Sequence, residues 1–214
     1  MVRTVVFDVG ETLVDESRIW LRWAERLGIP PFAFLGVLGG GVALDLSRDE
    51  VLGLLRPGLD LDAEAARWAR DDPDGLRTGF DATDLYPDVR PALGALREAG
   101  FDVVVAGNQP PEARAALEAM DLPVSAIRTS DEWGVQKPDP AFFARVAELS
   151  GVAPEEIAYV GDRLDNDVLP AADAGMVPVL LRRGPWGYLH ARRPEAARTT
   201  VIDSLTELPA LLAG

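Results

Sequence analysis

Short apolar runs alternate with longer amphipathic stretches along most of this 214-residue chain, and no other feature restricts the fold as strongly. The apolar runs occupy residues 4–7, 102–106, 124–129, 157–160 and 177–181. Their length and their β-branched residues predict buried parallel strands. Helices are predicted over 87–99, 140–150 and 165–174, because a glycine, the residue that most often ends a helix, follows each stretch. Repeated strand–helix units predict an α/β fold whose core is a doubly wound, Rossmann-like parallel sheet.

Residues 16–83 break this rhythm, because they contain helical patterns and no convincing strand. One amphipathic helix is predicted over 17–27 and another over 61–70. Ser47 is followed three residues later by Glu50, and this pair predicts a capping box at the start of a further helix. We therefore expect an inserted all-helical cap domain at 16–83, and an α/β core domain formed by residues 1–15 and 84–214.

The longest apolar stretch, residues 32–46, lies in the expected cap domain and contains three consecutive glycines at 39–41. It is shorter than the roughly 20 residues of a membrane-spanning helix. A buried cap helix with a break at the glycines fits this pattern better than a membrane contact. The aromatic residues of this region are expected to pack in the core of the cap domain rather than line a substrate pocket. They are Trp20, Trp23, Phe32 and Phe34.

The composition excludes several classes of protein. The formal net charge of −14 opposes binding to nucleic acids, whose partners need a basic face. Small anionic substrates remain compatible, since a bound divalent cation reverses the potential inside one pocket. The chain has no cysteine, so disulfides, thiolate metal sites and cysteine nucleophiles are excluded. The N-terminal residues lack the basic stretch and apolar run of a signal peptide, and we expect a cytoplasmic protein with no membrane partner.

Several residues that could take part in catalysis or ligand binding follow the predicted strands, at the edge where open α/β sheets bind ligands. They are Asp8, Gly107, Asn108, Lys137, Asp162 and Asp167. A lone aspartate at a strand end is more often a helix cap than a catalytic group. Several carboxylates at one point, however, repel one another unless a cation lies between them, and hard oxygen ligands favour Mg²⁺. We therefore expect a magnesium site, because His190 is the only histidine and a zinc cluster would lack further nitrogen ligands.

The order and spacing of these segments resemble the haloacid-dehalogenase-like (HAD) hydrolase superfamily, and the helical insertion resembles the type 1 cap of its subfamily I. The resemblance implies that Asp8 attacks phosphorus and forms an aspartyl-phosphate. It also implies that Mg²⁺ is bound by Asp8, by the backbone carbonyl of Gly10, and by Asp162 and Asp167.

The resemblance further implies how the phosphate is held. Lys137 would neutralise the charge on Asp8 and on the phosphoryl oxygens. It is the only lysine beside twenty arginines, and a compact ammonium group at this place has a physical reason, because the guanidinium of arginine is bulkier and planar. The backbone N–H of Gly107 and the side-chain amide of Asn108 would bind the phosphate.

The chain departs from the family pattern at two positions. Family phosphatases carry a second aspartate two residues after the nucleophile, where it protonates the leaving group, and this chain has Gly10 there. The general acid is therefore missing unless Glu11 replaces it; the alternative for Glu11 is a solvated carboxylate on a turn. The second departure is Gly107, which stands where the family has serine or threonine.

These observations predict a Mg²⁺-dependent phosphohydrolase that acts on a small phosphorylated metabolite. Loss of a general acid typically lowers a rate by 10²–10⁴-fold, so acyl phosphates, phenyl phosphates and anhydrides are the expected substrates. One alternative is a catalytically weak or inactive protein that uses the fold for binding or regulation. A 2-haloacid dehalogenase is less favoured, because dehalogenases of this family carry a tyrosine where this chain has Gly10. The identity of the substrate, and the choice between monomer and homodimer, stay open.

Overall fold

The computed structural model describes residues 1–72 and 79–213, and these divide into two compact units. The first unit combines Met1–Asp15 with Asp81–Gly214, and the second is Glu16–Phe80. The second unit is therefore an insertion into the first.

The inserted unit ends at Phe80, three residues before the boundary predicted at residue 83. The difference lies in Ala82–Asp84, which forms a short 3-10 helix. The backbone N–H of Asp15 donates to the carbonyl of Asp84 at 2.8 Å. This hydrogen bond joins the short helix to the first unit.

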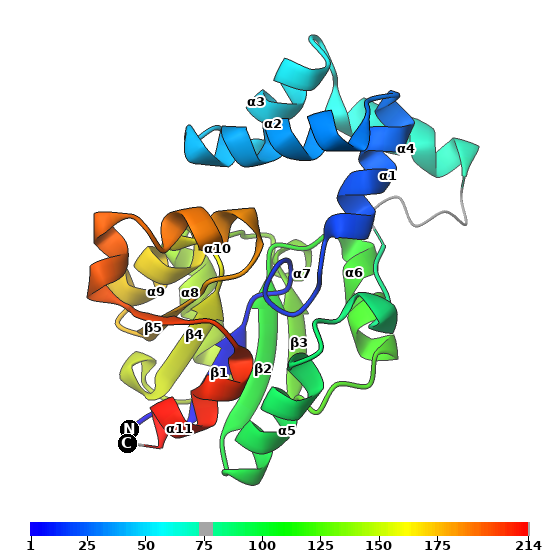
Figure 1. Ribbon diagram of the computed structural model, residues 1–214. Coiled ribbons are helices and arrows are strands. Elements are labelled where there is room, and N and C mark those ends of the chain that lie inside the picture. Colours follow the sequence, from blue (N-terminus) through cyan, green and yellow to red (C-terminus); the bar gives the residue numbers. More distant parts are fainter. Residues whose placement is uncertain (73–78, 214) are drawn as a thin grey trace. The chain divides into compact units, whose positions relative to one another are not determined.

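A single sheet of parallel strands forms the centre of the first unit, in the order β3-β2-β1-β4-β5-β6 (Figure 1). The strands are β1 (Thr4–Phe7), β2 (Asp102–Gly107), β3 (Ala126–Thr129), β4 (Ile157–Gly161), β5 (Val177–Leu181) and β6 (Thr200–Ile202). The predicted doubly wound α/β fold is confirmed. Because all strands are parallel, their carboxyl ends lie at one edge of the sheet, with β1 between β2 and β4.

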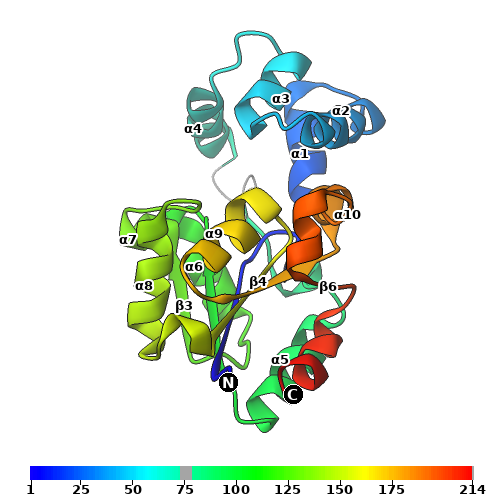
Figure 2. The same ribbon diagram turned by 90° about the vertical axis from the view of Figure 1, so that its left-hand side faces the viewer.

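Helices cover both faces of this sheet (Figure 2). Helices α8 (Pro140–Ser150) and α9 (Leu169–Asp173) pack on one face, and α5 (Val89–Glu98) and α11 (Leu208–Leu212) pack on the other. On the first face, Phe142, Phe143 and Val146 of α8 are fully buried against β-strand residues such as Val6, Val104 and Tyr159. Each such side chain stabilises the fold by about 1.5–3 kcal/mol through the apolar surface it removes from water.

The remaining helical segments of the first unit lie between the strands or, in one case, after the last strand. They are α6 (Pro111–Ala119), α7 (Ser130–Trp133) and α10 (Gly184–His190), the 3-10 helices Pro154–Glu156, Pro194–Arg198 and Leu205–Glu207, and the π-helix Leu164–Val168. The helix predicted over 165–174 is confirmed, because helical structure runs without a gap from Leu164 to Asp173; its first part is the π-helix and the remainder is α9 (Leu169–Asp173).

Every regular element in the described residues of the inserted unit is a helix. Its helices are α1 (Ser17–Leu27), α2 (Pro31–Ala43), α3 (Arg48–Leu55) and α4 (Leu61–Asp71). The predicted capping box at the start of α3 is present, with the Ser47 N–H donating to the Glu50 carboxylate at 2.8 Å. The core of this unit includes Trp23 and Trp68, whose rings meet edge to face with centroids 5.1 Å apart.

Two expectations about α2 were wrong. The helix runs without a break through the three glycines at 39–41. A Cβ atom on Gly41 would overlap the side chain of Val51 in α3, so this glycine lets the two helices approach closely instead of ending α2. Phe32 does not pack in the core of the unit, because 92% of its surface is exposed, whereas Phe34 is fully buried.

Among the described residues, no single helix is both long and apolar enough to cross a membrane. Helices α1 and α2 would reach the required length and composition only when taken together, and the chain bends by 116° between them.

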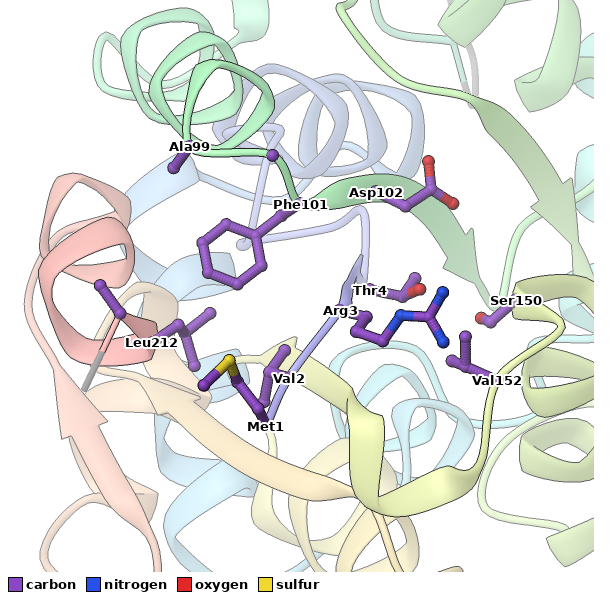
Figure 3. A pocket seen from close by; sticks show the side chains of 12 residues that line it. Met1, Val2, Arg3, Thr4, Ala99, Phe101, Asp102, Ser150, Val152 and Leu212 are labelled. Atoms are coloured by element: carbon purple, nitrogen blue, oxygen red, sulfur yellow. The ribbon is translucent and has the colours of Figure 1, made fainter.

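A cavity of about 540 Å³ opens at the edge of the sheet where the strands begin (Figure 3). Thr4 at the start of β1 and Asp102 at the start of β2 line it, together with Phe101 and Leu212. The residues singled out in the sequence follow the other ends of these strands. This cavity is therefore separate from the candidate site.

Candidate active site

The chain that follows β1 forms a tight turn closed on one carbonyl group; residues 9–14 are named here the β1 loop. Asp8 directly precedes it, and the Asp8 N–H donates to the carbonyl of Val160 in β4 at 2.9 Å. Three N–H groups of the loop donate to the carbonyl of Val9: those of Thr12, Leu13 and Val14, at 3.3, 2.8 and 3.0 Å. Glu11 adopts a left-handed φ of 51°, which lets the chain turn back. Asp8 is thus held at the carboxyl edge of the sheet between β4 and this loop.

Lys137 lies between two of the predicted carboxylates. Its Nζ donates to Asp8 Oδ1 at 2.6 Å and to Asp167 Oδ1 at 2.5 Å, and no part of its side chain is exposed. Burial lowers the pKa of Lys137, but the negative charges of Asp167 and Asp8 raise it by more, so the pKa lies well above its ordinary value. The group is therefore a permanent cation that bridges the two acids.

The side-chain amide of Asn108 makes two hydrogen bonds with the backbone of Lys137. Its Nδ2 donates to the Lys137 carbonyl at 2.9 Å, and its Oδ1 accepts from the Lys137 N–H at 2.8 Å. The sequence predicted that this amide binds phosphate. In the structure its oxygen and one of its N–H groups serve the backbone of the buried lysine.

Three carboxylates meet at this edge of the sheet. Asp8, Asp162 and Asp167 each offer an oxygen atom, and these atoms lie within 4.8 Å of one another. Burial and the neighbouring charges of Asp167 and Asp8 raise the pKa of Asp162 well above its ordinary value. Burial also raises the pKa of Asp167, to about 6, although Lys137 opposes the shift. The single ammonium group of Lys137 cannot balance three ionised carboxylates, so the site favours a further positive charge.

The buried oxygen Oδ2 of Asp162 has no hydrogen-bond partner within the part of the chain that the structure describes. A buried polar atom without a partner destabilises a fold by roughly 1–3 kcal/mol, so such atoms usually serve a ligand or ion. A small divalent cation with oxygen ligands fits this set of donors, because it would satisfy Asp162 and reduce the repulsion among the three acids.

The π-helix Leu164–Val168 brings Asp167 into the site. Its first N–H, that of Leu164, donates to Nδ1 of the buried His190 at 3.0 Å. The only histidine of the chain therefore supports this turn and does not lie among the clustered acids. Gly161, at the end of β4, is also required here, because a Cβ atom would overlap the side chain of Asp167.

Gly107 has a steric role that the sequence did not indicate. A Cβ atom at this position would lie 2.5 Å from Asp8 Oδ1 and 3.2 Å from Cγ2 of Val9. Real Cβ atoms do not approach other atoms as closely as 2.5 Å, so any side chain here would displace the Asp8 carboxylate. The glycine therefore gives Asp8 the space in which it reaches Lys137.

Glu11 is buried, with only 6% of its surface exposed, so the alternative of a solvated turn carboxylate was wrong. Its Oε2 accepts a hydrogen bond of 2.6 Å from the hydroxyl of Tyr86. Burial, together with the charge of Glu11, raises the pKa of Tyr86 far above its ordinary value, so the phenol keeps its proton. Sequence reasoning missed Tyr86, because 75 positions separate the two residues and no local pattern links them.

The chain is similar to known phosphatases over nearly its whole length. A glyceraldehyde 3-phosphate phosphatase of Methanopyrus kandleri is 32% identical over 234 aligned positions, which cover 97% of this chain and 96% of its own. Phosphoglycolate phosphatase 1 of Pseudomonas aeruginosa is 37% identical, with 96% of this chain and 78% of the relative covered.

A solved structure shares the architecture as well. The crystal structure of a dehalogenase with an intermediate complex is 26% identical, covers 100% of this chain and 98% of its own, and superposes with a TM-score of 0.67. The sequence profile of haloacid dehalogenase-like hydrolases matches residues 2–175, which is most of the chain. The chain therefore belongs to the family of haloacid dehalogenase-like hydrolases.

Proposed function

We propose that this protein is a Mg²⁺-dependent phosphohydrolase that acts on a small phosphorylated metabolite through an aspartyl-phosphate on Asp8. The observation that carries the proposal is the placement of Lys137, whose buried ammonium group bridges Asp8 and Asp167. These two acids lie close to Asp162, whose Oδ2 has no hydrogen-bond partner among the described residues. A nucleophilic carboxylate, a fixed cation and further acids for a metal are the parts that phosphoryl transfer to an aspartate requires.

Four groups would bind Mg²⁺. These are the carboxylates of Asp8, Asp162 and Asp167 and the backbone carbonyl of Gly10. The fit rests on hard oxygen donors and on the buried Asp162 Oδ2, which lacks a partner among the described residues. When bound, Mg²⁺ supplies positive charge that stabilises the phosphoryl oxygens in the transition state.

The chain's own residues would carry the reaction in two displacements. A carboxylate oxygen of Asp8 forms a bond to phosphorus, and the bond from phosphorus to the leaving oxygen breaks with its electron pair. Water then attacks phosphorus and the bond to Asp8 breaks, so phosphate leaves with the oxygen and both protons of that water and the free carboxylate is restored. Lys137 lies beside Asp8 throughout, so its charge favours the crowded anionic transition state. Asn108, which binds both backbone groups of Lys137, would position that charge.

The leaving group determines which substrates suit this site. Gly10 offers no carboxyl group, and the Glu11 carboxylate accepts the hydrogen bond of Tyr86. We therefore propose that leaving groups depart unprotonated, as in acyl and aryl phosphates. The relatives named above are called glyceraldehyde 3-phosphate and phosphoglycolate phosphatases. Both compounds are alkyl phosphates, whose leaving groups need a proton. Comparing their turnover with that of acyl and aryl phosphates therefore tests whether the site supplies a proton.

A substrate panel tests this function. It contains acetyl phosphate, p-nitrophenyl phosphate, phosphoglycolate and glyceraldehyde 3-phosphate, each with Mg²⁺ or with EDTA. We expect turnover that requires Mg²⁺ and is 10²–10⁴-fold faster with the first two compounds, the usual effect of a missing general acid. Equal rates with the alkyl phosphates would show that another group supplies the proton. No turnover of any compound would contradict the enzymatic proposal and favour a binding or regulatory protein.

A further inference from the structure

A second group of polar residues, distinct from Lys137, contacts the β1 loop. Its centre is Arg183, which follows β5 and is nearly buried, with 11% of its side chain exposed. The Arg183 guanidinium donates to the carbonyl of Thr12 at 2.8 Å and to Oδ2 of Asp88 at 2.5 Å. One planar group thus joins the loop to the start of α5, which is a geometry that suits arginine and not lysine.

Tyr86 holds the same loop at two further points. Its backbone N–H donates to the carbonyl of Leu13 at 3.0 Å, and its hydroxyl donates to Glu11 at 2.6 Å. The Arg183 guanidinium lies over the Tyr86 ring, 4.0 Å from its centroid, so the two residues support each other.

Asp88 fixes Arg183 in turn. Its Oδ2 also accepts from the hydroxyl of Ser204 at 2.8 Å and from the N–H of Leu205 at 3.0 Å. The acceptor of Arg183 is therefore anchored to a third segment of the chain. Such an acceptor leaves the guanidinium little freedom to move away from Thr12.

These contacts tie the β1 loop to other segments of the unit. Three of its N–H groups converge on the single carbonyl of Val9, which closes the turn but does not fix the turn's orientation against the rest of the unit. The carbonyls of Thr12 and Leu13 are held by Arg183 and Tyr86. The loop also contains Gly10, whose carbonyl is a proposed metal ligand, and it begins directly after Asp8.

We propose that Arg183 is a positioning residue for this site: together with Tyr86 it fixes the β1 loop, and thereby the carbonyl of Gly10 and the carboxylate of Asp8, in the geometry that binds Mg²⁺. The inference rests on the proposed function, because it takes the metal site from there. Neither residue is among the proposed metal ligands, so each acts on the site through the β1 loop, and the expected effect of changing either one is a loss of metal affinity.

The test measures Mg²⁺ binding by calorimetry in the wild-type protein and in Arg183→Lys. Lysine keeps the positive charge but cannot reach Thr12 and Asp88 with one rigid group. The matched control is Arg182→Lys. Arg182 is the preceding residue and forms a bidentate ion pair with Asp203 at 2.6 and 2.7 Å, but its side chain is 47% exposed and its side-chain partner is Asp203 instead of Thr12.

We expect the Mg²⁺ dissociation constant of Arg183→Lys to rise 10–100-fold, the usual effect of removing a group that orients a metal ligand, and that of Arg182→Lys to stay within about twofold. Turnover by Arg183→Lys should recover as Mg²⁺ approaches saturation. Tyr86→Phe, which removes one hydroxyl and keeps the ring, should weaken Mg²⁺ binding in the same direction.

A purely structural role predicts a different pattern. If Arg183→Lys and Tyr86→Phe lower the melting temperature but bind Mg²⁺ like the wild type, the inference is overturned while the proposed function stands. A wild-type protein that binds no Mg²⁺ would overturn both, and the wild-type titration separates the two failures.

Discussion

Asn108 and Lys137 are joined by two hydrogen bonds that close a ring between a side-chain amide and a peptide backbone. The Asn108 Nδ2 donates to the Lys137 carbonyl at 2.9 Å, and the Lys137 N–H donates to the Asn108 Oδ1 at 2.8 Å. The side chain of Lys137 thus bridges Asp8 and Asp167, and its backbone is fixed by Asn108, the residue that follows β2. The amide of Asn108 therefore contributes to the site by positioning Lys137.

We expect Asn108→Ala to reduce turnover of p-nitrophenyl phosphate and to destabilise the fold. Two backbone groups of Lys137 would lose their partners, at about 1–3 kcal/mol for each group that stays buried and unsatisfied. Urea unfolding measures the stability and steady-state kinetics measure turnover. Asn108→Asp is the comparison, because it keeps the acceptor for the Lys137 N–H but not the donor for its carbonyl. An alanine variant with wild-type stability and turnover would contradict the positioning role.

Gly107→Ser should lower activity, although it installs the hydroxyl that family members have at this position. The new Cβ would lie 2.5 Å from Asp8 Oδ1, so the carboxylate, which accepts a hydrogen bond from Lys137, must shift. The expected result is a fall in kcat with a folded protein, measured by kinetics and circular dichroism. Gly94→Ala in α5 is the control, because its Cβ meets no atom within 4 Å and removing a helical glycine stabilises by about 0.5–1 kcal/mol. A gain in kcat for Gly107→Ser would refute the steric argument.

Asp162→Asn should change stability in opposite directions without and with metal. In EDTA the variant should be more stable than the wild type by roughly 1–3 kcal/mol, because a carboxyl group buried beside two other acids is unfavourable, whereas an amide cannot ionise and can donate to those acids. Added Mg²⁺ should raise the melting temperature of the wild type through binding to the folded state, and leave that of the variant nearly unchanged. Thermal unfolding measures both. Equal Mg²⁺ stabilisation of the two proteins would exclude Asp162 as a ligand.

Asp88 should make the fold sensitive to acid. Burial raises the pKa of Asp88, but hydrogen bonds from Arg183, Ser204 and Leu205 lower it by more, so the pKa lies below its ordinary value. A carboxyl group with a lowered pKa stabilises the folded state above its unfolded pKa of about 3.9, and this contribution is lost as the pH falls through the folded pKa.

The comparison that isolates this effect is urea unfolding of the wild type and of Asp88→Asn from pH 7 to pH 3. The stability difference should be constant near neutral pH, at about 1–3 kcal/mol, and should shrink below about pH 4. A difference that stays the same at every pH would show that the charge of Asp88 contributes nothing.

Local patterns were sufficient for most elements of the fold. Helix α8 begins and ends as predicted, because Pro140 suits a first helical position and Gly151 adopts the left-handed conformation that ends a helix. Strand β6 was not predicted, since it has only three residues and two of them are exposed. The glycines of α2 were misread, because their function depends on the neighbouring helix and not on their own segment.

In the candidate site, too, some contacts could be predicted from the sequence and others could not. Residues that follow successive strands could be placed together from topology alone, and Asp8, Lys137 and Asp167 do lie in contact. The contacts that hold the β1 loop could not be anticipated, because Arg183 and Thr12 are 171 positions apart and no periodicity connects them. Such polar contacts depend on the packing of the finished fold.

The most direct test of the central claim is the steady-state release of p-nitrophenol from p-nitrophenyl phosphate by the wild type with Mg²⁺, by the wild type with EDTA, and by Asp8→Asn with Mg²⁺. We predict turnover in the first sample alone, because Asp8 is the nucleophile and its reaction requires the metal. Undiminished turnover by Asp8→Asn would contradict the account.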